Sequence, residues 1–590
     1  MTLSANPFLT EFVEDRQNDR VPAARPLPAS SIDILDASRD DVYWFHPYHT
    51  KVPPSAIRTL IEHYTQPGDL VLDPFCGSGM TGVAARQTGR HAVLIDLSPI
   101  ASFIAGVNVT RHDAAKAIDL LNAALTRAEE RWGWLYESEE RGQRSTVDYF
   151  VWSDVFTCPD CDSEFPFFPS GVIHHGNKVE TRKTFPCPNC TSELTVRRIQ
   201  RVMHDGRKAK QLVWVRSSVG RHRHNRPASV FDTELAQRAS ELSPEHWYPT
   251  DRIDPQGYSA QLAQLGDKGI TDVSRFLSER NLVIFADLWH AVTSEAHAST
   301  RQLAMATLTS IFTTVSERQG YFGGGGGMSG NFYMPIVRME KNPFEVLRRK
   351  LSRLAAAEEA KRDWAGSAIV SVQSATDLSA IPDSAIDFVY TDPPFGANII
   401  YSEMNLALES WIGVRTDPSL EAVIDPSKQE GADRYEGLLR EGFQEIFRVL
   451  KTDARAAVEF HNASADVWNV IQRVIAATGL VVERILLLDK GTTTILGDIR
   501  PGAAKHDLVI LCRKGTSAPD DGDAHPIEVD EVWRLVAERR REMGDGDARA
   551  RQPEMLFDFV VAQCLLRGAL VPLSANEFYD ELKRRFPTGG

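Results

Sequence analysis

The chain of 590 residues is too long for one ordinary hydrophobic core, so two to four structural units are expected. With 42% hydrophobic and 25% charged residues it has the composition of a soluble globular protein, and no stretch approaches the roughly 18 continuous apolar residues of a membrane span. The formal net charge of −14 argues against a basic surface over the whole molecule, so a nucleic-acid-binding surface must be local. The amino-terminal residues show no export signal, and we expect a cytoplasmic protein.

Residues 1–112 are predicted to hold the first half of an α/β domain. Within them, Asp69–Val107 has the pattern strand, glycine turn, helix, strand and helix, which is a βαβ unit with a right-handed crossover. The turn "DPFCGSG" follows the first strand, and Asp96 ends the second. In a doubly wound sheet such a turn lines the cofactor crevice, and an acid at the end of the next strand can bind two ribose hydroxyls.

The chemistry of this turn favours S-adenosylmethionine as the cofactor. Asp73 can face the methionine ammonium group and Asp96 the ribose, and the glycines let the backbone approach a ligand closely. No Gly-Lys-Ser/Thr follows, which argues against a phosphate-binding loop. An ordinary tight turn with a capping acid is the alternative. The predicted cofactor residues of this motif are Asp73, Pro74, Phe75, Cys76, Gly77, Gly79 and Asp96.

Residues 113–342 differ in composition and are predicted to form an insertion that is a candidate target-recognition region. It contains two Cys-x-x-C pairs whose separation suits a zinc ribbon with four thiolates, a type of site that is structural rather than catalytic. Zinc would let a small insert fold without a large core. Buried free cysteines or a redox pair are the alternative. The predicted ligands are Cys158, Cys161, Cys187 and Cys190.

A basic segment, Arg197–Arg226, follows the cysteine pairs. It holds ten Arg or Lys residues and one acid, Asp205, so its excess of nine positive charges leaves the rest of the chain at −14 − 9 = −23. We expect this segment to contact nucleic-acid phosphates; a solvated basic surface is the alternative. The predicted contacts are Arg197, Arg198, Arg201, Lys208, Lys210, Arg221 and Arg223. The later glycine run Gly323–Gly327 is either a mobile flap over the crevice or a flexible connection.

Residues 343–515 return to helices alternating with short β-rich runs, which predicts the second half of a mostly parallel sheet. One of these runs, "AIDFVY", is followed by "TDPPFG". If this strand lies beside the first strand, Asp73 and Asp392 face each other across one crevice. A helix that begins near Tyr401 can then line the target pocket.

The corner made by an acid, two prolines and an aromatic suits a flat substrate with an NH2 group. The Asp392 carboxylate and the Pro393 carbonyl can each accept one N–H, which lets the nitrogen pyramidalise toward a methyl sulfonium. The prolines hold the corner, and Phe395 can stack on a base that is flipped out of a duplex. The predicted catalytic residues are Asp392, Pro393, Pro394 and Phe395. Asp377 is a weaker candidate for contacting the cofactor adenine, with a helix cap as the alternative.

These motifs carry a family resemblance. "DPFCGSG", "DPPF" and the leader "HPYHTKVPPSAIRTLIEHY" resemble motifs I, IV and X of amino-group DNA methyltransferases, and with the cysteine pairs the chain is similar to adenine-specific DNA methylases that contain a zinc ribbon. The resemblance covers most of residues 40–515 and implies S-adenosylmethionine as cofactor. It also implies that the cofactor lies near His46, Pro47, Lys51 and Pro53. The aromatic of the corner is phenylalanine rather than the commoner tyrosine, so it can stack but cannot donate a hydrogen bond.

The predicted fold is α/β: a doubly wound, mostly parallel, Rossmann-like methyltransferase sheet with a large inserted region of zinc ribbon and helices. Residues 516–590 are predicted to be a linker and a small helical C-terminal unit. The predicted function is methylation of an exocyclic amino group in duplex DNA, with adenine N6 favoured. Cytosine N4, an amino group in RNA and a catalytically inactive nucleic-acid-binding scaffold are the alternatives. The resemblance also suggests a role in restriction or defence alongside companion proteins.

Overall fold

A computed structural model describes most of the chain. The described residues are 4–20, 31–33, 40–140, 142–175, 178–204, 206–220, 222–321, 332–397, 399–427, 431–489, 507–515, 525, 527–542 and 552–586. Arg221, the glycine run Gly323–Gly327 and most of the predicted linker lie outside the described residues, so the interpretations given for them remain predictions.

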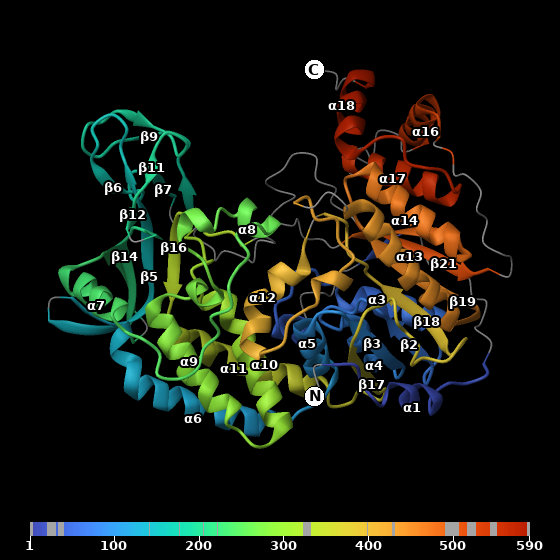
Figure 1. Cartoon of the computed structure of the whole chain (residues 1–590), viewed down its shortest axis with the longest axis horizontal. Helices are drawn as coiled ribbons and strands as arrows, with labels where there is room; N and C mark the ends of the chain where they lie inside the picture. The colour runs from blue at the N-terminus through green and yellow to red at the C-terminus, as the bar shows by residue number, and fades with distance from the viewer. Residues whose placement is uncertain are drawn as a thin grey trace.

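An eight-stranded sheet forms the centre of one half of the molecule, in the order β1-β20-β21-β19-β18-β2-β3-β17 (Figure 1). Every neighbouring pair is parallel except the two that involve β21, which runs antiparallel to β19 and β20. The predicted mostly parallel sheet is therefore confirmed. In sheet order the strands are β1 (Ser31–Asp33), β20 (Leu480–Asp489), β21 (Asp507–Lys514), β19 (Leu450–Phe460), β18 (Ile386–Thr391), β2 (Leu70–Asp73), β3 (His91–Asp96) and β17 (Ala368–Val372).

Two hydrophobic cores lie on opposite faces of this sheet, because successive residues of a strand point to opposite sides. Val71 of β2 belongs to the core that includes α3 and α4, whereas Leu70 and Leu72 belong to the core that includes α13 and α14. Every residue of β2 and β18 is buried, as expected for central strands that helices cover on both faces. The helices that cover the sheet include α3 (Pro54–Tyr64), α4 (Met80–Gln87), α5 (Pro99–Val109), α13 (Gly431–Val449) and α14 (Ala465–Thr478).

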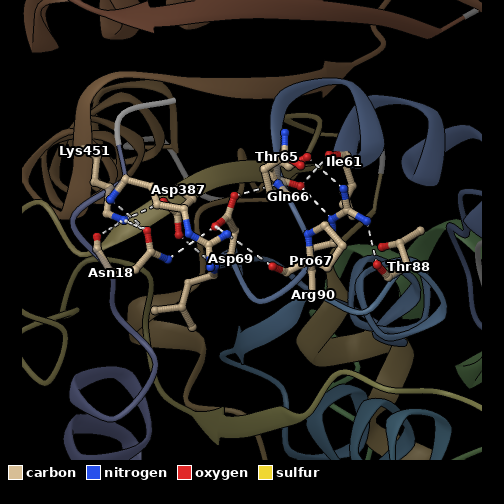
Figure 2. A network of polar contacts seen from close by, with 12 residues as sticks. Asn18, Ile61, Thr65, Gln66, Pro67, Asp69, Thr88, Arg90, Asp387 and Lys451 are labelled. Carbon is tan, nitrogen blue, oxygen red and sulfur yellow. Dashed lines mark hydrogen bonds and ion pairs between the residues drawn. The ribbon is translucent and has the colours of Figure 1, made fainter. Parts of the chain in front are cut away.

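A polar network ties the amino-terminal segment to the amino ends of the central strands (Figure 2). Lys451 of β19 donates a hydrogen bond to the Asn18 carbonyl oxygen and forms an ion pair with Asp387 of β18, with an N···O distance of 2.5 Å. The Asn18 side chain donates to Asp69 at 3.3 Å, and Asp387 accepts the backbone N–H of Leu70 at 2.9 Å. These contacts fasten the segment at the edge of the sheet opposite the carboxyl ends of the parallel strands.

The insertion lies beside the central sheet and is built on an antiparallel sheet of its own, which the sequence patterns did not predict (Figure 1). Its long strand β5 pairs with β14 and also with β16, which brings the chain back toward the central domain. Its strands include β4 (Glu137–Glu140), β5 (Gln143–Thr157), β6 (Glu164–Pro166), β11 (Gln200–Arg201), β14 (Lys210–Val219), β15 (His222–Pro227) and β16 (Val337–Lys341). The longer helices around it are α6 (Ala114–Trp132), α7 (Val230–Ser240), α9 (Glu279–Thr293), α10 (Ala298–Val315) and α11 (Pro343–Ala360).

The described residues of the C-terminal unit form three helices: α16 (Val529–Glu542), α17 (Pro553–Leu566) and α18 (Ala575–Arg585). Their apolar side chains join the core on the α13 and α14 face of the sheet. Trp533 stacks on Phe578 with ring centroids 5.0 Å apart, which joins α16 to α18. Among the helices that the structure describes, none combines the length and the apolar character needed to cross a bilayer.

Candidate active site

The carboxyl ends of β2, β3 and β18 open into one pocket of about 1000 Å³, part of which is open to solvent. Leu72 of β2 pairs with Val389 of β18, so Asp73 and Asp392 leave neighbouring strands at the same edge of the sheet. The structure thus brings the two sequence motifs together. The residues of these motifs that line the pocket are Asp73, Pro74, Phe75, Cys76, Gly77, Ser78, Asp96, Asp392 and Pro394.

Two glycines of the turn after β2 occupy positions that a larger residue could not fill. Gly79 has a φ of +79° and immediately precedes α4, and a Cβ there would lie 2.7 Å from the Cβ of Ala105. Gly77 has a φ of +49°, and its Cβ would lie 3.2 Å from the ring of Tyr48. A side chain at either position would strain the backbone and crowd a neighbour, so the turn requires glycine at both positions.

Asp73 is buried where β2 meets the turn. One carboxylate oxygen accepts a hydrogen bond from the Thr81 hydroxyl at 2.6 Å, and the other accepts the backbone N–H of Phe75 at 3.2 Å. Burial raises the pKa of Asp73 to about 7 even though these hydrogen bonds oppose the rise, and no Lys or Arg is among the main causes of the shift. A cationic group of a ligand beside Asp73 would stabilise its charged form.

Asp96 ends β3 and fixes the same turn. Its two oxygens accept the backbone N–H groups of Gly77 and Ser98, each at 2.8 Å. Burial raises the pKa of Asp96 to about 6, and the nearby carboxylates of Glu409 and Glu421 add to the rise. Each oxygen keeps a second lone pair, so this carboxylate can still accept two hydroxyl groups.

Negative groups dominate the electrostatics of the pocket. Lys51 is the one Lys or Arg side chain among the described residues that line it, and burial lowers its pKa to about 7. A ligand with positive charge and hydrogen-bond donors is therefore favoured over an anionic one. The carboxylates that line the pocket are Asp73, Asp96, Asp392 and Glu421.

The corner after β18 is only partly turned toward the pocket. Asp392 and Pro394 line it, whereas Pro393 is buried and is not among the lining residues. The Phe395 ring packs edge-on against Phe460, with centroids 5.3 Å apart, and is also absent from the lining. Acceptance of an N–H by the Pro393 carbonyl and stacking of Phe395 on a base therefore remain predictions.

Several lining residues were not assigned from the motifs. Tyr401 begins α12 (Tyr401–Ile412), as expected for a helix whose start lines the pocket, and its hydroxyl lies 3.1 Å from that of Thr50. Glu421 accepts the backbone N–H of Tyr401 at 2.6 Å and so caps that helix. Tyr48 also lines the pocket, and its place inside the leader motif was a usable signal. Glu421 lies 20 residues after Tyr401, in a segment with no local sequence pattern that could have identified it.

Some residues predicted near the cofactor lie outside the pocket lining. His46 is buried, its Nε2 lies 3.0 Å from the Thr309 hydroxyl, and burial lowers its pKa to about 3, so the ring is neutral and packs against α10. Asp377 is exposed and accepts the backbone N–H of Ser379 at 3.1 Å in the connection between β17 and β18, where no helix is described, so it does not cap a helix. Pro53 immediately precedes α3 as its N-cap residue.

The four cysteines of the two pairs form one cluster in the insertion, with all four Sγ atoms within 4.8 Å of one another. The Sγ atoms of Cys158 and Cys190 lie 3.8 Å apart, and those of Cys161 and Cys187 lie 3.9 Å apart. A tetrahedron of thiolates about 2.3 Å from a zinc ion has edges of about 3.8 Å, so the arrangement fits such an ion. The two loops match, since Cys158 and Cys187 each accept a backbone N–H four residues later, at 2.9 and 3.0 Å.

Part of the basic segment faces inward. Lys208 and Lys210 lie 3.7 and 2.6 Å from the carboxylate of Glu317, and Arg201 lies 3.2 Å from that of Asp154. Burial alone would raise the pKa of Glu317, but these lysines and a neighbouring arginine lower it well below its usual range. These three cations of the segment serve the stability of the insertion.

Some arginines of the described basic segment face solvent, whereas Arg226 is mostly buried and forms an ion pair with Asp232 at 2.6 Å. Arg197 and Arg223 are exposed, and Arg198 forms an ion pair with Asp160 at 3.0 Å. Arg223 lies on β15, an edge strand of the insertion sheet, between the exposed residues His222 and His224. Phosphate binding by the outward-facing arginines remains a prediction.

The fold and the pocket define an α/β protein with a candidate cofactor site. The site lies between β2 and β18, where the order in which the chain adds strands to the sheet reverses. Residues 27–104 match the protein family described as DNA methylase, of the N6/N4 type. The matched part of the chain contains Asp73 and Asp96, and this part is similar to amino-group DNA methylases. It does not extend to Asp392.

Individual relatives also match this chain over short segments only, of 52 to 89 residues. The type II methyltransferase M.MjaII of Methanocaldococcus jannaschii is 33% identical over 89 residues, which are 15% of this chain and 17% of that protein. The type II methyltransferase M.XycI of Xanthomonas campestris pv. cyanopsidis is 46% identical over 52 residues, 9% of this chain and 17% of that protein. The matches thus span about a sixth of these relatives.

Among solved structures, TTHA0409 of Thermus thermophilus, described as a candidate DNA modification methylase, is 15% identical to this chain. The alignment covers 36% of this chain and 94% of that one, with a TM-score of 0.14. A likeness this weak carries no argument about function.

Proposed function

We propose that this protein is an S-adenosylmethionine-dependent DNA methyltransferase that modifies an exocyclic amino group, with adenine N6 as the favoured target. The observation that carries the proposal is the shared pocket, in which Asp73 and Asp96 of one motif lie at the same edge of the sheet as Asp392 of the other. The family match of residues 27–104 supports DNA as the substrate.

The residues of the first motif suit a cofactor with a cationic tail and a ribose. Asp73 would hold the ammonium group, because its buried carboxylate gains from a cationic partner. Asp96 would accept the two ribose hydroxyls while it keeps its bonds to the turn. When bound, S-adenosylmethionine supplies a methyl group on a positively charged sulfur, a charge that the acidic pocket favours.

Asp392 is the proposed catalytic residue. Its carboxylate would accept one N–H of the target amine, and a main-chain carbonyl of the corner would accept the other. These bonds draw the nitrogen lone pair out of conjugation with the ring and hold it toward the methyl group. The proton that the nitrogen loses then passes to Asp392 or to water.

DNA is the proposed partner, and a base within a duplex would have to be flipped to reach the pocket. Arg197, Arg198 and Arg223 are the described cations of the basic segment that face solvent and would contact phosphates. Companion restriction or defence proteins and a cytoplasmic location are expectations that rest on the sequence.

We further infer that the four-cysteine cluster holds a structural zinc ion. The sulfur separations near 3.8 Å and the matched backbone loops support four thiolate ligands. With its coordination filled by protein, such an ion would stabilise the insertion and take no part in the reaction.

Incubation of the protein with methyl-labelled S-adenosylmethionine and, separately, duplex DNA or RNA tests the proposal. We expect label in N6-methyladenine from DNA, and no label with Asp392→Ala. Label in N4-methylcytosine would keep the mechanism and change the target, and label only in RNA would overturn DNA as the substrate. A wild-type protein that labels neither nucleic acid, on DNA of diverse sequence, would contradict the proposal.

A further inference from the structure

Two side chains outside the motifs hold the main chain of the Asp392 corner. Tyr435 of α13 donates a hydrogen bond from its hydroxyl to the Pro394 carbonyl oxygen at 2.7 Å. Asn462, just after β19, donates from its side-chain amide nitrogen to the Phe395 carbonyl oxygen at 2.9 Å. Two successive carbonyls of the corner are therefore each held by a side chain that comes from another element.

The corner has few backbone hydrogen-bond donors of its own. Pro393 and Pro394 have no backbone N–H, and the corner follows β18 without continuing its ladder of hydrogen bonds. Gly396, next in the chain, has a φ of +70°, which favours glycine, and its carbonyl oxygen accepts the backbone N–H of Ile424 at 3.2 Å. The hydrogen bonds to the Pro394 and Phe395 carbonyl oxygens therefore restrain main chain that the strand ladder does not hold.

The two supporting side chains are themselves firmly placed. Tyr435 is fully buried, and burial raises the pKa of its hydroxyl, so the group stays protonated and remains a donor. The Asn462 side-chain oxygen accepts the backbone N–H of Ser464 at 2.8 Å, and its carbonyl accepts the Trp468 indole N–H at 2.9 Å. These bonds fix the side-chain nitrogen that points at the corner.

The C-terminal unit forms hydrogen bonds with the loop that carries Asn462 and with α14, the helix that follows it. The carbonyl oxygen of Ala463 accepts the backbone N–H of Ala575, at the start of α18, at 2.9 Å. Asn469 of α14 exchanges two hydrogen bonds with the main chain of Val571, at 2.7 and 3.1 Å. The loop that carries Asn462 is thus held between the central sheet and the C-terminal helices.

We propose that Tyr435 and Asn462 are positioning residues, which orient the Asp392 corner for methyl transfer by holding its carbonyl groups. Neither residue lines the pocket, so neither is expected to touch the cofactor or the target base. Because a misplacement of about 1 Å can cost about 100-fold in rate, loss of either hydrogen bond should act on turnover rather than on binding. This inference rests on the proposed methyltransferase function.

The test uses the full chain and three variants: Tyr435→Phe, Asn462→Ala and Asn462→Asp. Asn462→Asp keeps an oxygen for the Ser464 N–H but lacks the donor to Phe395, so it separates positioning from capping of the loop. Tyr579→Phe is the control, since the hydroxyl of this buried tyrosine has no hydrogen-bond partner within the described part of the chain. For each protein, kcat and KM for duplex DNA, the Kd for S-adenosylmethionine and the melting temperature are measured.

We expect kcat to fall about 10- to 100-fold in all three variants, with the cofactor Kd changed less than twofold and the control unchanged. Wild-type kcat in Tyr435→Phe and Asn462→Asp would overturn the positioning role while leaving the proposed function intact. A parallel loss of cofactor affinity and melting temperature would also overturn it, since that marks general destabilisation. A wild-type protein that transfers no methyl group would overturn the proposed function and the positioning role together.

Discussion

Buried carboxylates in the two halves of the molecule have opposite surroundings. In the pocket, burial raises the pKa of Asp73 to about 7, and no Lys or Arg is among the main causes of the shift. In the insertion, burial would likewise raise the pKa of Glu317, but Lys210, Arg338 and Lys208 lower it well below its usual range. The same burial therefore leaves one carboxylate in need of a cation and the other already satisfied.

This difference distinguishes a carboxylate that can bind a ligand from one that stabilises the fold. A charged group that the protein pairs internally stabilises the fold, as Arg338 does with Asp154 at an N···O distance of 2.6 Å. A buried acid that lacks a cationic partner costs stability, and it persists where a ligand can supply the missing charge. The predictions below test this contrast.

The largest effect is expected from Asp392→Ala in the pocket. Loss of the carboxylate removes the acceptor that orients the amine, and methyl transfer should fall about 1000-fold or more. Cofactor affinity should stay within a few-fold of wild type, because Asp73 and Asp96 are unchanged. Transfer of labelled methyl groups to DNA and a cofactor titration measure the two quantities. Asp383→Ala, an exposed acid on the same half of the chain, is the control, and equal losses in both variants would refute the assignment.

The next effect concerns the insertion. Cys187→Ser removes one thiolate of the cluster, and we expect the protein to lose its bound zinc, about one ion per chain, and to unfold locally in the insertion. Metal analysis and limited proteolysis measure these changes. Cys564→Ser is a matched control, because this cysteine is buried in the C-terminal unit, away from the cluster. Zinc content that is unchanged in Cys187→Ser would exclude the four-thiolate site.

Cofactor binding should depend on pH in the pocket. Asp73 is neutral below its pKa of about 7 and charged above it, so affinity for the ammonium group should rise about tenfold from pH 6 to pH 8. Asp73→Asn should bind more weakly at pH 8 and lose most of this dependence. Calorimetric titration at several pH values measures it. Affinity that instead falls as the pH rises would contradict the proposed contact.

The smallest effect is expected in the basic segment, where outward-facing cations should affect DNA binding and inward-facing cations should affect stability. Arg223→Ala should weaken DNA binding a few-fold and reduce the salt dependence by about one charge, without a change in stability. Lys210→Ala should instead lower the free energy of unfolding by about 3 kcal/mol, because Glu317 loses its nearest lysine. Binding at several salt concentrations and urea unfolding measure the two effects. The reverse pattern would assign the phosphate contacts to the wrong face.

Local patterns predicted much of the central domain. The alternation of apolar runs and helices predicted the mostly parallel sheet, and the glycine turn placed Asp73 and Asp96 at strand ends, where they line the pocket. The antiparallel sheet of the insertion was not predicted, because β5 is a long strand whose partners lie as far away as β16. His46 was expected near the cofactor by resemblance, yet it packs against Thr309, a contact that no local pattern reveals.

The sequence by itself determined the residue types of the site: an acid after one strand, an acid-Pro-Pro corner after another, and four cysteines in two pairs. These are chemical properties of short segments, which need no knowledge of the rest of the chain. The tertiary structure alone decided which lysines turn inward, that Glu421 caps the helix of Tyr401, and that Tyr435 and Asn462 hold the corner. Such contacts join segments that are distant in sequence, and only the packing of the whole sheet brings them within hydrogen-bond distance.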